Sequence, residues 1–431
     1  MIGVLFIVFF VFLGFAVPIA IAMAFGAWAP ILLGAPGISG VGYLIRNAFS
    51  GADTTPIIAV PLFILAGAIM AEGGISRKLF DVFACVAGKR AGGLPCAVIM
   101  TCLFYGAISG SGPATTAAVG AMAIPFMEGL GYDKAFCAAI IAVSGGLGVI
   151  IPPSIPFVLY SLATGVSTGS LFMAGILPGI FIGICLMACA VWQCRKKGED
   201  KVAIGEKVDE LKKFGFIKLL RDSFWALLSP VIVLGGIYSG FFTPTEAACV
   251  SVFYSFIISI FVYKSVTAPQ VLSLLRGAVK TYTPLLFIIA FAVAFGRVLT
   301  LLKAPALISD YMLSTFGSKI TVLAAIVVVF FVIGMVMDQG PAIVIMAPLL
   351  LPIVSAMGVD PTHFGVIMVV NLSIGLATPP FGLDLFVAGT LAGLPPMAVA
   401  KKALPFIAVF AVAIIAITYL PPISLLLPGC A

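Results

Sequence analysis

The stretch YGAISGSGPATTAAVG, Tyr105 to Gly120, contains four glycines, two serines, two threonines and a proline. It lies in a chain of 431 residues in which 62% are hydrophobic and 9% are charged. Polar, irregular backbone at membrane depth persists only when it is buried in protein or lines a wet cavity, because lipid cannot hydrogen-bond to it. The interpretation of the chain therefore depends on why this polar stretch interrupts an apolar sequence.

The composition predicts an all-α protein that crosses a membrane several times. Apolar runs continue over about 20 residues, the length of a spanning helix, rather than alternating over about 10 as in a β-barrel. The run from Ile2 to Phe25 lacks a basic leader and a cleavage motif, so we interpret it as a retained first helix. The net charge of +7 does not indicate nucleic-acid binding, because the basic residues fall in short loops.

The distribution of basic residues predicts the orientation. The only long hydrophilic segment, Arg195 to Asp222, has more Lys and Arg than Asp and Glu. The positive-inside rule places this segment in the cytoplasm. We therefore expect an inner-membrane protein with a cytoplasmic N-terminus and a periplasmic C-terminus.

Turn-forming residues recur at a nearly constant separation, which indicates an internal duplication. The matched positions are Thr55 and Pro56 with Thr283 and Pro284, Gly112 and Pro113 with Gly340 and Pro341, and Gly131, Asp133, Pro152 and Pro153 with Gly358, Asp360, Pro379 and Pro380. An additional helix from Phe224 to Tyr238 would turn the second half over and make the repeats inverted. Inverted repeats with interrupted helices are typical of secondary transporters whose site lies near the midplane.

The opening stretch is predicted to form a re-entrant hairpin. Its arms, Leu94 to Ile108 and Pro113 to Glu128, would reach roughly 22 to 24 Å, short of the ~30 Å hydrocarbon core. The alternative is one spanning helix kinked at Gly112 and Pro113; the similar break in MDQGPA, from Met337, favours the hairpin. Gly112, Thr116 and Gly120 share one helix face and would allow another helix to approach closely.

Oxygen-rich turns suit a hard cation, and helix N-termini near Pro113, Pro153, Pro341 and Pro380 favour an anion. An acid at membrane depth is a functional-site hypothesis by default. Asp338 is a candidate ligand or a helix cap, and Asp384 either lines the cavity or caps a turn. Asn371 and Ser373 supply either ligand oxygens or interhelical hydrogen bonds.

Two other polar residues are interpreted as structural. His363 follows an interfacial turn, and Glu246 complements a helix N-terminus. No catalytic or nucleotide-binding motif is present, so we expect neither an enzyme nor a cofactor, with sodium or a proton as the coupling ion.

The chain resembles the large M subunit (DctM type) of tripartite ATP-independent periplasmic (TRAP) transporters, in the ion transporter superfamily. The resemblance covers essentially the whole chain. It rests on the motifs FSGADTTPIIAVPLFILAGAIM (from Phe49), LGVIIPPSIP (from Leu147), GFFTPTEAA (from Gly240), MDQGPAIVIMAPLLLP (from Met337) and GVDPTHFGVIMVVNLSIGLATPPFG (from Gly358).

This resemblance implies sodium-coupled uptake of an organic acid anion by an elevator mechanism, with a small Q-type membrane subunit and a periplasmic substrate-binding protein as partners. It implies two sodium sites and a substrate site between them. The first sodium site would use Ser109, Gly110, Ser111, Gly112, Ser144, Gly145 and Gly148. The second would use Asp338, Gln339, Gly340, Asn371, Ser373 and Thr378. The substrate would lie near Pro113, Thr115, Pro153, Ser154, Pro341 and Pro380.

The resemblance also implies a scaffold and a moving transport domain, each built from both halves. Scaffold helices with an arm are expected over 1–93 and 223–318, and transport-domain halves with a hairpin and a broken helix over 94–168 and 319–396. A helix and cytoplasmic connector are expected over 169–222, and a C-terminal helix over 397–431. The alternatives are a stand-alone sodium/dicarboxylate symporter and, from another class, an intramembrane enzyme or a non-transporting scaffold.

Overall fold

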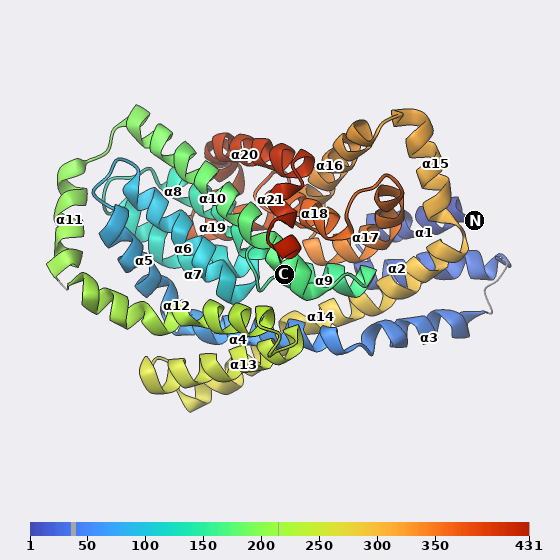
Figure 1. Ribbon diagram of the computed structural model, residues 1–431, viewed down its shortest axis with the longest axis horizontal. Helices are drawn as coiled ribbons and strands as arrows, with labels where there is room; N and C mark the ends of the chain where they lie inside the picture. The colour runs from blue at the N-terminus through green and yellow to red at the C-terminus, as the bar shows by residue number, and fades with distance from the viewer. Residues whose placement is uncertain (36–39, 214, 431) are drawn as a thin grey trace.

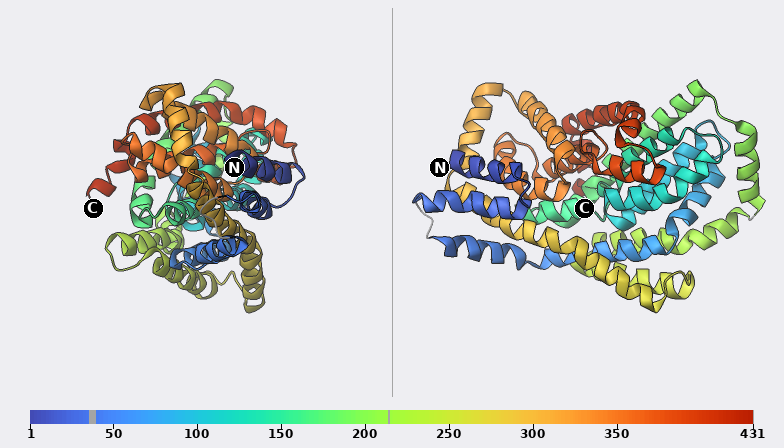
Figure 2. Two further views of the ribbon diagram at one scale, coloured as in Figure 1. Left: turned by 90° about the vertical axis from the view of Figure 1, so that its right-hand side faces the viewer. Right: turned by 180° about the vertical axis from the view of Figure 1, so that it is seen from behind.

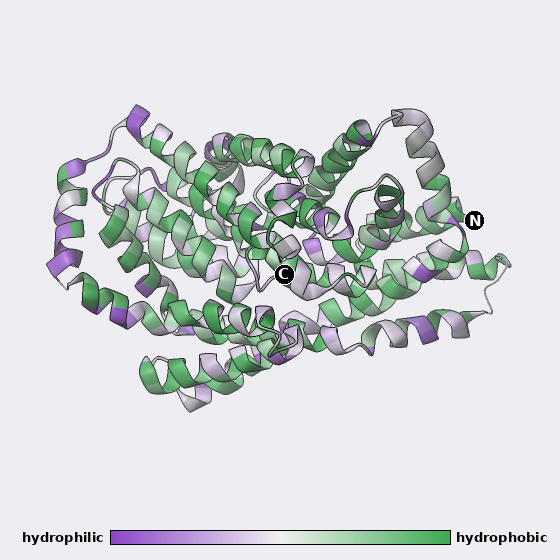
Figure 3. Ribbon diagram, in the orientation of Figure 1, coloured by the Kyte–Doolittle hydropathy of each residue, from purple (hydrophilic) through white to green (hydrophobic). Residues whose placement is uncertain are grey.

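The computed structural model describes residues 1–35, 40–213 and 215–430, and all regular elements in these ranges are helices (Figure 1). Seven helices among the described residues are long and apolar enough to cross a membrane. Figure 3 shows hydrophobic ribbon over most of the molecule, with hydrophilic residues concentrated near α11 (Lys201–Lys213). The prediction of an all-α polytopic membrane protein is confirmed.

The N-terminal run does not form one helix, and the predicted span from Ile2 to Phe25 is wrong. The structure has α1 (Ile2–Gly14) and α2 (Ile19–Leu32), which pack against each other. Ala16 takes a left-handed backbone conformation (φ 57°), and Pro18 precedes the first turn of α2. Proline inside a helix would remove a hydrogen bond and clash with the preceding turn, so the helix ends before it.

The two halves contain corresponding series of helices, and α12 corresponds to α1. The helix from Phe224 is therefore not an addition to the second half, as the sequence had suggested. The first half continues with α3 (Val41–Ala52), α4 (Ala59–Glu72), α5 (Ile75–Ala87), α6 (Gly93–Ser109), α7 (Gly112–Glu128), α8 (Lys134–Gly145), α9 (Ile155–Thr164) and α10 (Thr168–Lys197). The second has α12 (Phe216–Tyr238), α13 (Pro244–Ile257), α14 (Ala268–Leu301), α15 (Ala304–Phe316), α16 (Lys319–Val336), α17 (Gln339–Ala356), α18 (Pro361–Gly375), α19 (Leu383–Ala392) and α20 (Pro396–Tyr419). The short α21 (Pro422–Leu425) follows.

Corresponding elements run in opposite directions. In Figure 1, α3 and α4 run from right to left along the lower part of the molecule, and α14 passes alongside them from left to right. The view from behind in Figure 2 shows the same arrangement. The packing is also reciprocal, since α7 packs on α19 and α17 packs on α9. This arrangement is that of an inverted repeat.

Close glycine contacts occur at matched positions in the two halves. A Cβ atom on Gly106 would collide with the backbone of Gly148, and one on Gly375 would collide with the backbone of Gly334. A Cβ atom on Gly146 would lie 3.1 Å from the carbonyl oxygen of Ser373, its counterpart in the other half. The axis that relates the two halves therefore passes between the two interrupted helices.

Both predicted helix breaks are present. α8 continues into a short 3₁₀ segment, Gly146–Val149, and the chain is irregular until α9 begins at Ile155. In the second half α18 ends at Gly375 and α19 begins at Leu383. The Pro152–Pro153 and Pro379–Pro380 bonds are both cis.

The two hairpins differ in length. α6 and α7 have 17 residues each, whereas α16 and α17 have 18 each and are among the helices long enough to cross a membrane. A re-entrant path therefore stays a prediction, most clearly for the second pair. The predicted packing face of α7 is confirmed, because a Cβ atom on Gly120 would lie 2.8 Å from Leu391 of α19 and 3.2 Å from Ile141 of α8.

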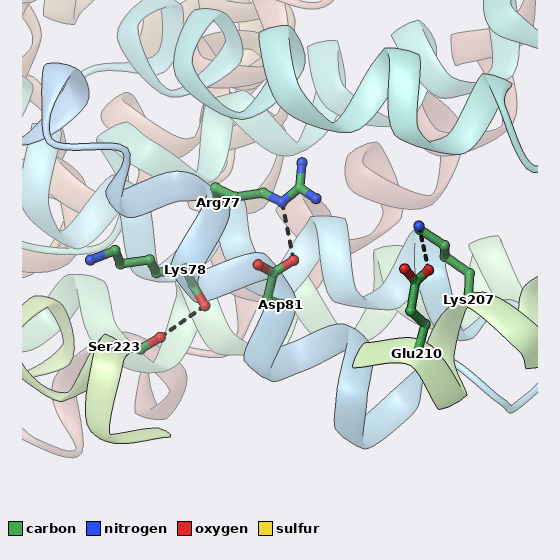
Figure 4. Close-up of polar contacts among 6 residues, drawn as sticks. All are labelled: Arg77, Lys78, Asp81, Lys207, Glu210 and Ser223. Atoms are coloured by element: carbon green, nitrogen blue, oxygen red, sulfur yellow. Dashed lines mark hydrogen bonds and ion pairs between the residues drawn. The ribbon is translucent and has the colours of Figure 1, made fainter. Parts of the chain in front are cut away.

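Polar contacts hold the arm helix α5 and the connector. The Ser223 hydroxyl of α12 donates to the Lys78 carbonyl at 2.9 Å, and Arg77 pairs with Asp81 at 3.2 Å along α5 (Figure 4). On the connector helix α11, Lys207 pairs with Glu210 at 2.5 Å. The predicted place of Glu246 in the first turn of a helix is confirmed in α13, where the structure adds a capping box between Thr243 and Glu246.

We expect Gly106→Ala and Gly334→Ala to destabilise the protein by about 1–3 kcal/mol each, the usual cost of overpacking a filled interior. The methyl group added at Gly106 would lie 2.3 Å from the Gly148 Cα atom, and the one added at Gly334 would lie 3.0 Å from the Leu372 carbonyl oxygen and 3.2 Å from the Gly375 Cα atom. Gly235→Ala, inside α12 with nothing within 4 Å of the added atom, is the matched control. Thermal unfolding in detergent measures the difference. Equal unfolding temperatures for all three variants would contradict the proposed role of these contacts.

Candidate functional site

The two predicted tips open into one cavity of about 400 Å³. Ser109 to Pro113 line it from the first hairpin, and Asp338 to Gly340 line it from the second. These segments are more than two hundred residues apart in the sequence. The structure therefore brings the two duplicated interruptions to the same place.

The opposite wall of the cavity comes from α4 and α14. Small residues of α4 face the first tip, and a Cβ atom on Gly67 would lie 3.0 Å from the Cα atom of Ser109. Ala68 and Ala71 continue this wall, and α14 adds Thr281 and Leu285. Sequence reasoning missed these residues because nothing in their pattern distinguishes a cavity wall from an ordinary helix contact.

Four helices begin at the cavity. Gly112, Ile155, Gln339 and Leu383 line it, and they are the first residues of α7, α9, α17 and α19. A helix N-terminus carries unpaired N–H groups and a partial positive charge, which favours an anion. The predicted convergence of helix N-termini in the cavity is therefore present.

The hydroxyl groups of Ser109 and Thr115 have hydrogen-bond partners within the first tip. Thr115 donates to the Ser111 carbonyl at 2.8 Å, and its hydroxyl lies 2.9 Å from that of Ser109. Gly110 takes a left-handed conformation (φ 62°) that a side chain would strain. Ser109 and Ser111 thus shape the turn through hydrogen bonds, and their remaining oxygen lone pairs stay available.

The first tip packs on the interrupted helix of its own half. The Ile155 N–H donates to the Gly110 carbonyl at 3.3 Å. A Cβ atom on Gly148 would lie 3.1 Å from the Ser111 carbonyl oxygen, and one on Gly145 would lie 3.2 Å from the Gly112 carbonyl oxygen. The structure therefore gathers the predicted first set, with Ser144 preceding Gly145 at the end of α8.

Two further residues lie beside this set. Asp384, in the first turn of α19, is fully buried, and its Oδ2 atom would lie 3.2 Å from a Cβ atom on Gly112. Thr116 is also fully buried and lies between Asp384 and Gly145. The sequence showed that Thr116 shares a face with Gly112. No pattern indicated that Asp384 reaches the first hairpin.

The second tip is less satisfied than the first. Asp338 caps α17 by accepting a hydrogen bond from the Gln339 N–H at 2.8 Å, and the side chain is open to the cavity. The Gln339 side chain is buried, and neither atom of its amide has a hydrogen-bond partner among the described residues. Gly340, which belongs to the predicted second set, has two apolar neighbours that do not: a Cβ atom on it would lie 3.3 Å from Leu285 and 3.4 Å from Leu159.

The remaining residues of the predicted second site lie on or just after α18. The side-chain amide nitrogen of Asn371 donates to the Ile367 carbonyl at 2.7 Å. The side-chain oxygen Oδ1 of Asn371 is buried without a partner among the described residues. Ser373 donates to Val370 and Thr378 donates to Ile374. These hydrogen bonds all stay within this segment.

The predicted substrate residues differ in their positions. Pro113 lines the cavity. Thr115 is held inside the first tip, and Ser154 is buried, donating to the Val149 carbonyl and capping α9 at Phe157. Pro341 is buried in the first turn of α17, Pro153 is buried before α9, and Pro380 lies in the break before α19.

His363 is buried at the opposite end of α18 from the break. One ring nitrogen lies 3.2 Å from the Thr418 carbonyl oxygen, a structural contact between α18 and α20. This position agrees with the structural interpretation of His363.

Residues 6–423 match the family described as tripartite ATP-independent periplasmic transporter, DctM component. The chain is 43% identical to the isethionate TRAP transporter permease protein DctMQ of Oleidesulfovibrio alaskensis, over 99% of this chain and 66% of that protein. The chain thus spans about two thirds of that relative. It is 40% identical to the C4-dicarboxylate TRAP transporter large permease protein DctM of Pseudomonas aeruginosa, over 90% of this chain and 89% of that one.

The fold also resembles a solved structure, the YdaH transporter of Alcanivorax borkumensis. The TM-score is 0.61 with 14% sequence identity, and the match covers 88% of each chain. At this identity the likeness concerns the fold alone. The matched length, the identity to named permeases and the duplicated hairpins agree, and the chain belongs to the DctM family of TRAP transporter large permease subunits.

Proposed function

We propose that this chain is the large membrane subunit of a binding-protein-dependent secondary transporter, driving uptake of an organic acid anion with sodium. One observation carries the proposal: both interrupted hairpins and the starts of four helices meet in a single cavity. Interrupted helices at matched positions of inverted repeats are where secondary transporters bind substrate and ion.

The cavity suits an anion accompanied by cations. Its lining, within the described part of the chain, includes Asp338 and contains no Lys, Arg or His. An anionic substrate must then be stabilised by helix N-termini and by bound cations. The relatives are named for isethionate, C4-dicarboxylates, 2,3-diketo-L-gulonate and sialic acid, which are all organic acids.

Sodium is the coupling ion in this proposal. One positive charge that moves inward gains about 2.3 kcal/mol per 100 mV of membrane potential. Two ions therefore more than offset the cost of moving one monoanion inward against the same potential. The first site would use Ser109 to Gly112 with Ser144, Gly145 and Gly148, and the second Asp338 to Gly340 with Asn371, Ser373 and Thr378.

We further propose that the transport domain moves as an elevator. The cavity lies between the tips and the wall formed by α4 and α14. Each tip meets this wall at a glycine: a Cβ atom on Gly67 would lie 3.0 Å from the Ser109 Cα atom, and one on Gly340 would lie 3.3 Å from Leu285. Helices α5 and α15 would act as the arms that join the two domains.

The proposed partners are a small Q-type subunit and a periplasmic binding protein. The match to the relative named DctMQ covers 66% of that protein. The proposed setting is the bacterial inner membrane, with the N-terminus in the cytoplasm and the binding protein docking at the periplasmic face.

Reconstitution tests the requirement for partners. We expect liposomes with this chain, its small subunit and its binding protein to accumulate a labelled organic acid under an inward sodium gradient, because delivery and docking are needed to load the cavity. Isethionate, succinate and sialic acid are the probes. Uptake by the chain alone would instead favour a stand-alone symporter, and equal uptake with potassium in place of sodium would contradict sodium coupling.

Substitution at the tips tests the ion sites. We expect Asp338→Ala to weaken the apparent sodium affinity of uptake about tenfold or more, since it removes a charged ligand, a change of about 1.4 kcal/mol. Ser111→Ala is expected to weaken sodium dependence less, because only a hydroxyl is lost. Asp209→Asn, on the exposed surface of α11, is the control. Unchanged sodium dependence in both tip variants would show that the ions bind elsewhere.

A further inference from the structure

We propose that Asp384 is the charged ligand of the first sodium site, reaching it from the opposite half of the chain together with Thr116. The inference rests on the sodium coupling proposed above and extends it to two residues outside both predicted ion-ligand sets. The first sodium site would then be formed by residues of both the first hairpin and the second interrupted helix.

Four oxygen atoms surround the point where Gly112 meets Gly145. A Cβ atom on Gly112 would lie 3.2 Å from Oδ2 of Asp384 and 3.5 Å from the carbonyl oxygen of Gly145. A Cβ atom on Gly145 would lie 3.2 Å from the carbonyl oxygen of Gly112 and would collide with Oγ1 of Thr116. Two carbonyls, one hydroxyl and one carboxylate therefore lie close to this pair of glycines, and a side chain on Gly145 would have no room.

The polar side chains of this cluster have few partners. Asp384 and Thr116 are each fully buried. The Thr116 hydroxyl faces the Asp384 carboxylate, and neither side chain makes a hydrogen bond to any other described residue. A buried carboxylate whose neighbour is one hydroxyl group is poorly compensated, and buried polar groups in native proteins are normally satisfied. A bound cation satisfies all four oxygens at once.

The alternative role as a helix cap does not account for Asp384. It lies in the first turn of α19, where a carboxylate could accept from free N–H groups. The cap position belongs to Gly382, however, and no side chain caps this helix. The backbone N–H of Asp384 itself donates to the Leu376 carbonyl at 2.9 Å, which fixes the backbone beside the first hairpin.

The surrounding charges favour a monovalent cation. No Lys, Arg or His pairs with Asp384 among the described ion pairs, and the nearby carboxylate of Asp338 repels it. Calcium usually takes six to eight oxygen ligands including several carboxylates. One carboxylate with three neutral oxygens matches the charge of a single sodium ion.

The site would couple ion binding to the cavity. Gly112 belongs both to this cluster and to the cavity lining, and Leu383 next to Asp384 also lines the cavity. A cation between Asp384 and Gly112 draws the starts of α7 and α19 together. Sodium therefore fixes the position of two of the four helix N-termini that would face the substrate.

Sodium-dependent thermal stability of the purified full chain tests this assignment without requiring transport. We titrate sodium against potassium at constant ionic strength and compare wild type with Asp384→Asn, which keeps the shape and removes the charge. We expect the apparent sodium affinity of the first site to fall about tenfold or more, and one sodium-dependent step to disappear. Thr116→Val should weaken sodium binding, and Thr116→Ser, which retains the hydroxyl, should restore it.

The comparison with uptake separates the two proposals. In the reconstituted complex, Asp384→Asn should lower the Hill coefficient for sodium by about one. A folded Asp384→Asn protein with wild-type sodium affinity and Hill coefficient would overturn the role of Asp384 while leaving sodium coupling intact. Wild type that neither binds nor uses sodium would overturn both. If Asp384→Asn does not fold, wild-type sodium affinity in Thr116→Val would overturn the site.

Discussion

Backbone contact through glycine is the constraint on which the rest of the structure depends. Gly106 meets Gly148 in the first half, and Gly334 meets Gly375 in the second, at distances that admit no side chain. These contacts press each hairpin against the interrupted helix of its own half. The interrupted helices in turn touch at Gly146 and Ser373. Carbonyl groups that a regular helix would use internally are thereby held together in the interior, where they can act as ligands.

Much of the central architecture was predictable because proline and glycine act locally. Pro113 and Pro341 open helices, the Pro152–Pro153 and Pro379–Pro380 pairs interrupt them, and the duplication identifies both breaks. The position of Glu246 in the first turn of a helix was predictable from the same kind of local signal. The N-terminal pair α1 and α2 could not be predicted, since both helices are apolar throughout and Pro18 is the only proline between them. Without that break, the correspondence between α1 and α12 was hidden.

The composition of the first ion cluster could not be predicted from the repeat. The constant separation between the repeats pairs each interrupted helix with the hairpin of its own half. On that pairing, Asp384 would lie at the second tip. In the structure α19 packs on α7 and α9 packs on α17. Each second segment therefore packs on an arm of the other hairpin, although the start of α9 also bonds the first tip through Ile155 and Gly110. Only the packing between halves brings Asp384 to Gly112, and a single sequence contains no signal for it.

The two hairpin tips differ in their hydrogen bonding, although the two halves of the chain have corresponding helices. At the first, Thr115 binds Ser109 and Ser111, so the turn is internally satisfied. At the second, Ile343 and Gln339 occupy the positions that correspond to Thr115 and Ser111, and the Gln339 amide is buried without a partner among the described residues. The first tip is thus held by its own hydrogen bonds, whereas the second leaves a buried amide that a ligand bound under the proposal would satisfy.

This inequality bears on the order of binding under the proposed sodium coupling. Asp338 and Asp384 place two carboxyl groups near a cavity whose described lining has no basic side chain. An anion that entered first would meet no counter-cation there, and helix N-termini offset only part of its charge. A cation at the first tip supplies part of the missing positive charge before the substrate arrives. Once the cation sites are occupied, the four helix N-termini can bind an anion. The bound cations then form part of the surface that the substrate contacts.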